Sequence, residues 1–144
     1  MEGQVELIVG LIGGLIGFCV ILIVCLVPII GVWKTYTKAG QSGWASIIPI
    51  YNNYVIAKIV YGEKLGYIGI VGILIAYIPV IGTLASMIFW VYTWYYLFKA
   101  YNCTGGTAIL YTIFPLIGFI CIGFGKSSYI GVQDNMITQK LTKE

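Results

Sequence analysis

The side chains best suited to chemistry in this sequence lie between positions 44 and 61. The adjacent Asn52 and Asn53 can each donate and accept hydrogen bonds, and Lys58 follows six residues after Asn52. Such groups suit ligand binding or the lining of a polar path, because they include no acid and base matched for proton transfer near neutral pH. The candidate binding or pore-lining residues are therefore Trp44, Pro49, Tyr51, Asn52, Asn53, Tyr54 and Lys58.

The rest of the sequence offers little for catalysis. It contains no His and no Arg, which removes the usual proton-transfer group at neutral pH, the commonest metal ligand and the bidentate anion clamp. Glu63 is the only acidic residue between Glu6 and Asp134, so no carboxylate pair is available. The cysteines form no CxxC pair. We therefore predict no catalytic residue, no bound metal and no cofactor. The four cysteines are Cys19, Cys25, Cys103 and Cys121.

Composition places the chain in a membrane. Of its 144 residues, 60% are hydrophobic and 9% are charged, and the mean hydropathy is +0.96. A soluble domain of this length could not bury so much apolar surface, because small domains keep a large exposed area. The net charge of +3 is too small to indicate a nucleic-acid partner. The composition predicts an all-α integral membrane protein whose main partner is the lipid bilayer.

Apolar runs without charge predict about four transmembrane helices, since a bilayer core needs about 20 helical residues. The run from 65 to 98 is too long for one helix, and Pro79 and Gly82 in its middle predict a tight helical hairpin. Residues 125–144 read as a polar tail. No linker separates a second domain, so 1–144 is predicted to be a single multi-pass domain. The predicted spans are about 7–32, 65–79, 80–98 and 107–124.

The first span carries closely spaced glycines. Small residues at this spacing leave one helix face bare, which lets another backbone approach closely. They could form a packing seam, within the chain or between copies in a homo-oligomer. They could equally reflect the ordinary enrichment of glycine in membrane helices. The candidate seam consists of Gly10, Gly13, Gly14 and Gly17.

The stretch at about 44–61 predicts a further helix that begins after Pro49, because proline is well tolerated in the first turn. In such a helix Tyr51, Tyr54, Lys58 and Tyr61 share one stripe about 80° wide, which suits the lipid headgroup layer. The helix could lie in the interface or re-enter the membrane. A full span is a third reading, opposed by the cost of placing Lys58 within the bilayer.

Lysine counts set the predicted orientation. With the N-terminus outside, the inner segments carry five lysines and the outer segments carry three. This predicts a cell-membrane protein with both its N-terminus and its C-terminus outside.

The segment KAGQSGWASIIPIYNNY, together with GFGKSSYIG near the last span, resembles a family of small bacterial and archaeal multi-span membrane proteins of unknown function. The shared signature reads KAG-x-x-GW-x-x-x-x-P-x-YN, and the likeness runs from about 20 to 131. The loop KAYNCTGG departs from the family, which often has a basic residue where this chain has Tyr101 and Asn102. The matching residues are Lys38, Ala39, Gly40, Gly43, Trp44, Ile48, Pro49, Tyr51, Asn52, Lys58, Gly123, Gly125, Tyr129 and Gly131.

The resemblance implies the multi-span architecture and no known reaction. Some relatives are labelled as associated with signal peptidases, whose chemistry would need a serine beside a deprotonated lysine. Ser42, Ser46 and Ser86 lack that context here. We expect a non-enzymatic protein that binds itself, another membrane protein or lipid. An oligomeric channel or small transporter is the alternative.

Overall fold

The computed structural model describes residues 1–141, and within them the chain forms helices and no strand. Lys143 and Glu144 of the predicted tail lie outside the described residues. In chain order the elements are α1 (Glu2–Lys38), η1 (Gly43–Ser46), α2 (Pro49–Tyr61), η2 (Glu63–Leu65), α3 (Tyr67–Ala76), α4 (Ile81–Lys99), α5 (Gly105–Ile113), α6 (Pro115–Phe124) and α7 (Met136–Leu141).

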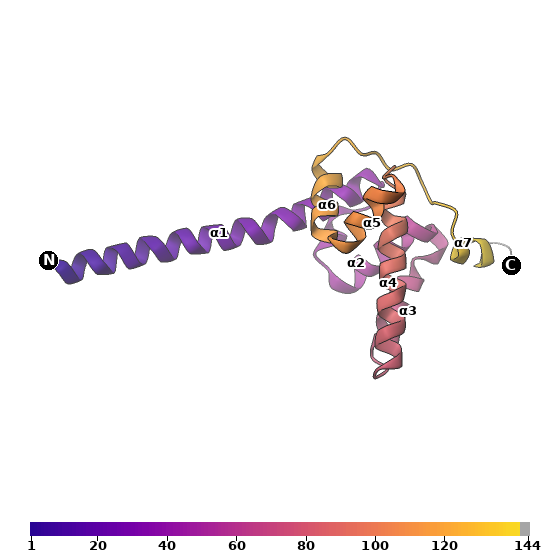
Figure 1. The fold of residues 1–144 in the computed structure, drawn as a ribbon, viewed down its shortest axis with the longest axis horizontal. Coiled ribbons are helices and arrows are strands. Elements are labelled where there is room, and N and C mark those ends of the chain that lie inside the picture. The colour runs from indigo at the N-terminus through magenta and orange to yellow at the C-terminus, as the bar shows by residue number, and fades with distance from the viewer. Residues whose placement is uncertain (142–144) are drawn as a thin grey trace.

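Two apolar parts project from a compact centre (Figure 1). The N-terminal two thirds of α1 extend away alone, and the tip of the α3–α4 hairpin extends in another direction. The centre consists of the C-terminal end of α1 with α2, α5, α6 and the base of the hairpin. Two helices, α1 and α4, are long and apolar enough to cross a membrane.

The remaining predicted spans are shorter than expected. The hairpin turns at the predicted place, but α3 has 10 residues and rises only about 15 Å. The predicted span 107–124 is divided at Phe114, where the backbone leaves helical geometry and Pro115 begins α6. Proline starts a helix readily because its missing N–H has no partner in the first turn. The structure therefore does not confirm four full-length transmembrane helices.

Helix α2 forms the middle of the core. It begins at Pro49, as predicted, and packs against α3 and α4. The expected tyrosine stripe is divided, because Tyr61 is only 3% exposed and its hydroxyl lies 2.7 Å from Thr93 Oγ1 on α4. The C-terminal half of α2 is buried on most of its sides, because consecutive residues are buried and a helix turns by about 100° per residue. The buried residues are Val55, Ile56, Ala57, Ile59, Val60 and Tyr61.

Helices α1 and α6 meet backbone to backbone. A side chain on Gly31 would lie 3.1 Å from the Phe119 carbonyl oxygen, and one on Gly123 would lie 2.9 Å from Gly31 Cα. Beside this crossing, Lys38 Nζ donates to the carbonyl oxygens of Ile122 at 2.5 Å and Gly125 at 2.7 Å. A cation at the C-terminal end of α6 satisfies carbonyls that the helix leaves free and complements its dipole.

The segment after α6 returns over the compact centre. Lys38 Nζ also donates to the carbonyl of Ser127 at 3.1 Å, and the Tyr129 hydroxyl donates to the carbonyl of Ile59 at 3.0 Å. The Ile130 N–H donates to the carbonyl of Ala100 at 2.8 Å. The tail therefore contacts the ends of α1, α2 and α4, which the sequence places inside. That the C-terminus lies outside stays a prediction.

Replacing Gly123 with Ala tests the helix crossing. The added methyl would press on the backbone of α1, so we expect a loss of about 1–3 kcal/mol in unfolding free energy. Gly14→Ala is the matched control, because a side chain there meets nothing within 4 Å. Both changes raise helix propensity equally, so their difference reports the packing. Equal stabilities of the two variants in detergent, measured by circular dichroism, would contradict the crossing.

Candidate functional site

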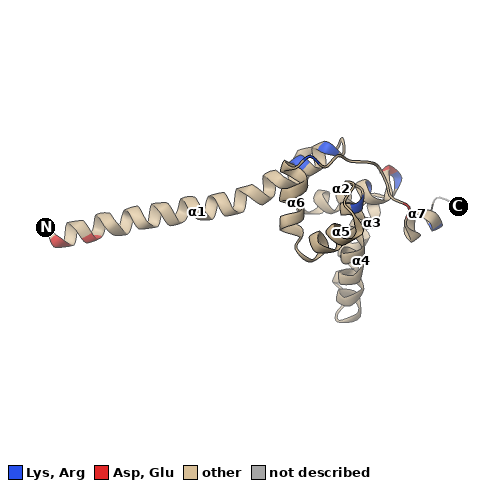
Figure 2. Cartoon of the chain, turned by 45° about the horizontal axis from the view of Figure 1, so that its top comes forward, with Lys and Arg blue, Asp and Glu red and all other residues tan. Residues whose placement is uncertain are grey.

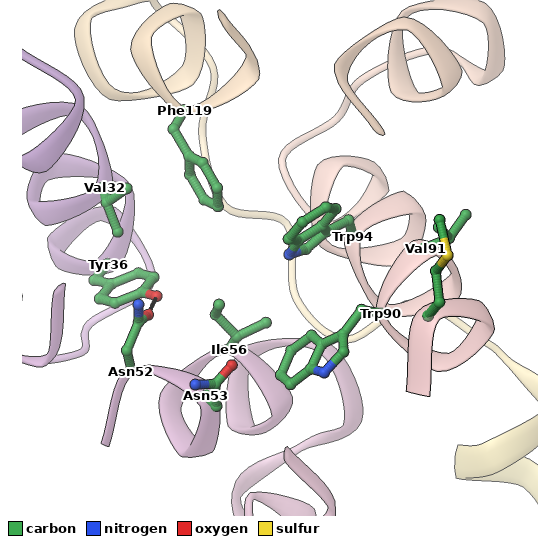
Figure 3. Close-up of a pocket in the computed structure, with 10 residues that line it drawn as sticks. Val32, Tyr36, Asn52, Asn53, Ile56, Trp90, Val91, Trp94 and Phe119 are labelled. Atoms are coloured by element: carbon green, nitrogen blue, oxygen red, sulfur yellow. Dashed lines mark hydrogen bonds between the residues drawn. The ribbon is translucent and has the colours of Figure 1, made fainter. Parts of the chain in front are cut away.

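A cavity of about 520 Å³ lies between α1, α2, α4 and α6 (Figure 3). Its volume falls in the usual range for small-molecule sites. Of the seven residues predicted for binding, Asn52 and Asn53 line it and the other five do not. Its lining residues are Val32, Tyr36, Asn52, Asn53, Ile56, Met87, Trp90, Val91, Trp94 and Phe119.

One wall is fixed by a hydrogen bond between two helices. The hydroxyl of Tyr36, a fully buried α1 residue, donates to Asn52 Oδ1 in the first turn of α2. This bond takes up the carbonyl oxygen of the Asn52 amide, and the NH₂ group of that amide donates to no described residue (Figure 3). A buried hydroxyl without such a partner would be costly, so the pair sets the position of α2 relative to α1.

Asn53 differs from Asn52 in which side-chain atom is left without a hydrogen bond. Its Nδ2 donates to the carbonyl of Pro49 at 2.6 Å, within α2 itself. Its Oδ1 accepts no hydrogen bond from any described residue, and Figure 3 shows this oxygen on the cavity side. The local bond holds the rotamer, which leaves one oriented acceptor at the cavity.

The opposite wall is aromatic and comes from α4. Trp90 and Trp94 stand one helical turn apart, and Phe119 of α6 faces them across the space (Figure 3). Trp90 is held in place by an edge contact with Phe89 at 5.3 Å between ring centroids. The Trp94 N–H points into the cavity and donates to no described residue. The cavity therefore offers apolar walls, one donor from an indole and amide groups opposite.

Lys58 lies apart from the cavity and forms an ion pair. Its Nζ is 2.5 Å from Glu63 Oε1. The hydrogen bond with Glu63 raises the pKa of Lys58, and the same bond lowers the pKa of the glutamate. Because Glu63 is exposed, water screens the attraction and the pair contributes little to stability. The pair closes the end of α2, where the tail residue Tyr129 also lies.

The predicted aromatic residues fall in two other places. Trp44 is 64% exposed and packs edge-on against Trp33 at 4.9 Å. Tyr51 and Tyr54 stack at 6.0 Å on a face of α2 away from the cavity. Pro49 acts as the helix start and as the acceptor for Asn53. These positions suit an interface with lipid or water more than a shared pocket.

The glycines of the predicted seam contact nothing in the described chain. A side chain built on Gly10, Gly13, Gly14 or Gly17 would meet no atom within 4 Å. The close glycine crossing occurs instead at Gly31 and Gly123. A seam between copies therefore stays a prediction.

Sequence reasoning missed three residues that define the cavity. Tyr36, Trp90 and Trp94 were not among the residues predicted for binding. The i, i+4 spacing of the tryptophans could have shown that they share a helix face. Nothing in the sequence paired that face with Asn52 and Asn53, because the pairing depends on how α2 crosses α4.

A family model matches residues 44–132, from Trp44 through α2 to α6 and the start of the tail. The chain belongs to this family of unknown function, DUF5684. The match confirms the resemblance at that level. It includes both asparagines and both cavity tryptophans but leaves α1 outside, along with the first residues of the proposed signature. No curated protein and no solved structure matches the chain.

The bond between Tyr36 and Asn52 can be tested by a double-mutant cycle. Tyr36→Phe removes the donor and leaves a partly buried amide oxygen unpaired, so we expect a loss of about 1–2 kcal/mol in unfolding free energy. Combined with Asn52→Leu, the losses should be non-additive by about 1 kcal/mol. Tyr51→Phe, where the side chain is 42% exposed, is the control and should change little. Additive effects in thermal unfolding would show that the two residues are independent.

Proposed function

We propose that this protein is an integral membrane protein that acts by binding another membrane helix through α1, with a second copy of itself as the first candidate, and not by catalysis. One observation carries the proposal. Residues 2–26 of α1 are exposed along their whole length, yet the sequence there is almost entirely apolar. In water such a helix would be a severe liability, whereas a bilayer or a partner helix would cover it.

The helix lengths support one full crossing and two shallow hairpins. Helix α1 is about 55 Å long, more than a bilayer core needs. By contrast α3, α5 and α6 have ten residues or fewer, about half of that core. The α3–α4 and α5–α6 pairs would then enter the membrane and return to the side they left.

Charge agrees with this arrangement. Figure 2 places the lysines on the compact centre and the tail, and only acidic residues at the far end of α1. The bonds from Lys38, Tyr129 and Ile130 hold the tail on the lysine-bearing side. We propose an N-terminus outside and a C-terminus inside, which replaces the sequence-based prediction for the C-terminus. All described lysines then lie inside, as the positive-inside rule favours.

Thiol labelling from one side of the membrane tests this topology. With the four native cysteines replaced by serine, Lys64→Cys and Asp134→Cys should both react only with a reagent supplied inside, because the tail contacts the end of α2. Gly3→Cys should react only from outside. Labelling of positions 64 and 134 from opposite sides would exclude the arrangement and restore the sequence-based topology.

Self-association through α1 is tested by adding bulk to its glycine face. Gly14→Leu should shift the chain from oligomer to monomer in mild detergent, because a large side chain keeps the two backbones apart. Cys19→Leu adds bulk on the opposite face, by the helical period, and should leave the oligomer intact. Cross-linking followed by size measurement reports the oligomeric state of both variants. If Gly14→Leu leaves the oligomer unchanged, α1 does not associate through this face.

An oligomeric channel is the second candidate. The division of α5–α6 at Pro115 favours it, since discontinuous helices commonly line transport sites. Ion flux in liposomes that is lost on Asn52→Leu would favour this candidate over binding.

A further inference from the structure

We propose that the cavity between α1, α2, α4 and α6 binds a neutral, single-chain lipid of the monoacylglycerol class. The inference rests on the membrane location proposed above and not on self-association through α1. The charge, the polar groups and the access route of the cavity each favour such a ligand.

The absence of charge selects a neutral ligand. Among the described residues none that lines the cavity carries a charge at neutral pH, and the one titratable group, the Tyr36 hydroxyl, is occupied by Asn52. An anionic or cationic headgroup would lose its water there without gaining a counter-ion, which is costly. The nearest cation on α2, Lys58, is held by Glu63 in a separate depression.

The polar groups that remain match hydroxyl and ester oxygens. Asn53 Oδ1 can accept a hydrogen bond from a ligand hydroxyl, and the Trp94 N–H can donate to a ligand oxygen (Figure 3). Asn52 also lines the cavity, and its NH₂ group is a further donor. No described residue uses these three groups. A ligand that both donates and accepts, and that carries no charge, therefore satisfies the site best. Glycerol hydroxyls joined to an ester carbonyl have this character.

The cavity is also open to the membrane. Met87 and Val91 line it, yet they are 66% and 47% exposed on the outer face of α4. Because α4 is apolar enough to cross a membrane, this face would contact lipid chains directly. An acyl chain can thus enter sideways between α1 and α4 and lie along Val91 and Phe119. The volume of about 520 Å³ fits one small amphiphile.

Quenching of tryptophan fluorescence by brominated lipids tests the proposal. Replacing Trp33 and Trp44 by Phe leaves Trp90 and Trp94, both at the cavity, as the only tryptophans, which are excited selectively over the tyrosines at long wavelength. In phosphatidylcholine nanodiscs, brominated monoacylglycerol should reach half-maximal quenching at about one tenth of the mole fraction that brominated phosphatidylcholine or brominated phosphatidylglycerol needs.

Matched variants separate the cavity from general lipid contact. Val91→Phe should fill the cavity and abolish the preference for monoacylglycerol. Ile88→Phe, on the same helix and 71% exposed but outside the cavity, should preserve it. Asn53→Leu removes the acceptor and should raise the half-quenching mole fraction by about threefold to tenfold.

Three outcomes would overturn the proposal. Equal quenching by all three lipids would mean general lipid contact only, and stronger quenching by phosphatidylglycerol would mean an anionic ligand. If Val91→Phe lowers the unfolding temperature, a competition experiment on the protein with an intact cavity decides between a site and general contact. Unbrominated monoacylglycerol is added to that protein after quenching by the brominated form. Unbrominated monoacylglycerol should then restore fluorescence in a saturable way, and failure to do so would exclude the site. Thiol labelling reports the membrane topology separately, so failure of the lipid site and failure of the proposed location are distinguishable.

Discussion

The close approach of α1 and α6 is the contact on which the rest of the structure depends. Gly31 and Gly123 allow the two backbones to touch, and any larger side chain at either position would separate them. Lys38 then closes the end of α6 by donating to its last carbonyls. Since α1 and α6 supply Val32, Tyr36 and Phe119 to the cavity, its shape depends on this contact, which is made at Phe119 and next to Val32. One charged side chain and two glycines thus set the distance between the cavity walls that α1 and α6 contribute.

The thickness of a lipid bilayer imposes a second constraint, because it sets the helix length that a crossing needs. A bilayer core requires about 20 helical residues, and only α1 and α4 approach this among the described elements. Short helices in an apolar chain would leave backbone groups exposed to lipid unless their ends were covered. The tail covers part of the base of the hairpins, because Tyr129 and Ile130 donate hydrogen bonds to the carbonyls of Ile59 and Ala100, near the ends of α2 and α4.

The sequence was sufficient to predict local structure but not its assembly. Pro49 as a helix start and the turn near Pro79 were both correct, because proline acts on the residues next to it. Tyr61 was misplaced, since helical period alone cannot tell a headgroup-facing stripe from a core-facing one when tyrosine suits both. The pairing of Tyr36 with Asn52 joins residues on different helices, and no spacing rule connects them. The contacts of the tail escaped prediction for the same reason, because they depend on carbonyls of α2 and of the residue after α4.

The two surfaces proposed for binding, the exposed length of α1 and the cavity, belong to different parts of the chain. The exposed length of α1 lies outside the region that defines the family, whereas the cavity is built mainly from that region, with α1 adding Val32 and Tyr36. A partner helix needs a long bare face, which α1 offers between residues 7 and 26 without any charged, amide or hydroxyl side chain. A small ligand needs enclosure and a few oriented polar atoms, which Asn53 and Trp94 offer. Because Tyr36 belongs to α1 and holds Asn52 at the cavity rim, a partner that shifts α1 would also move that rim. The bond between Tyr36 and Asn52 is therefore the point where association and ligand binding would be coupled.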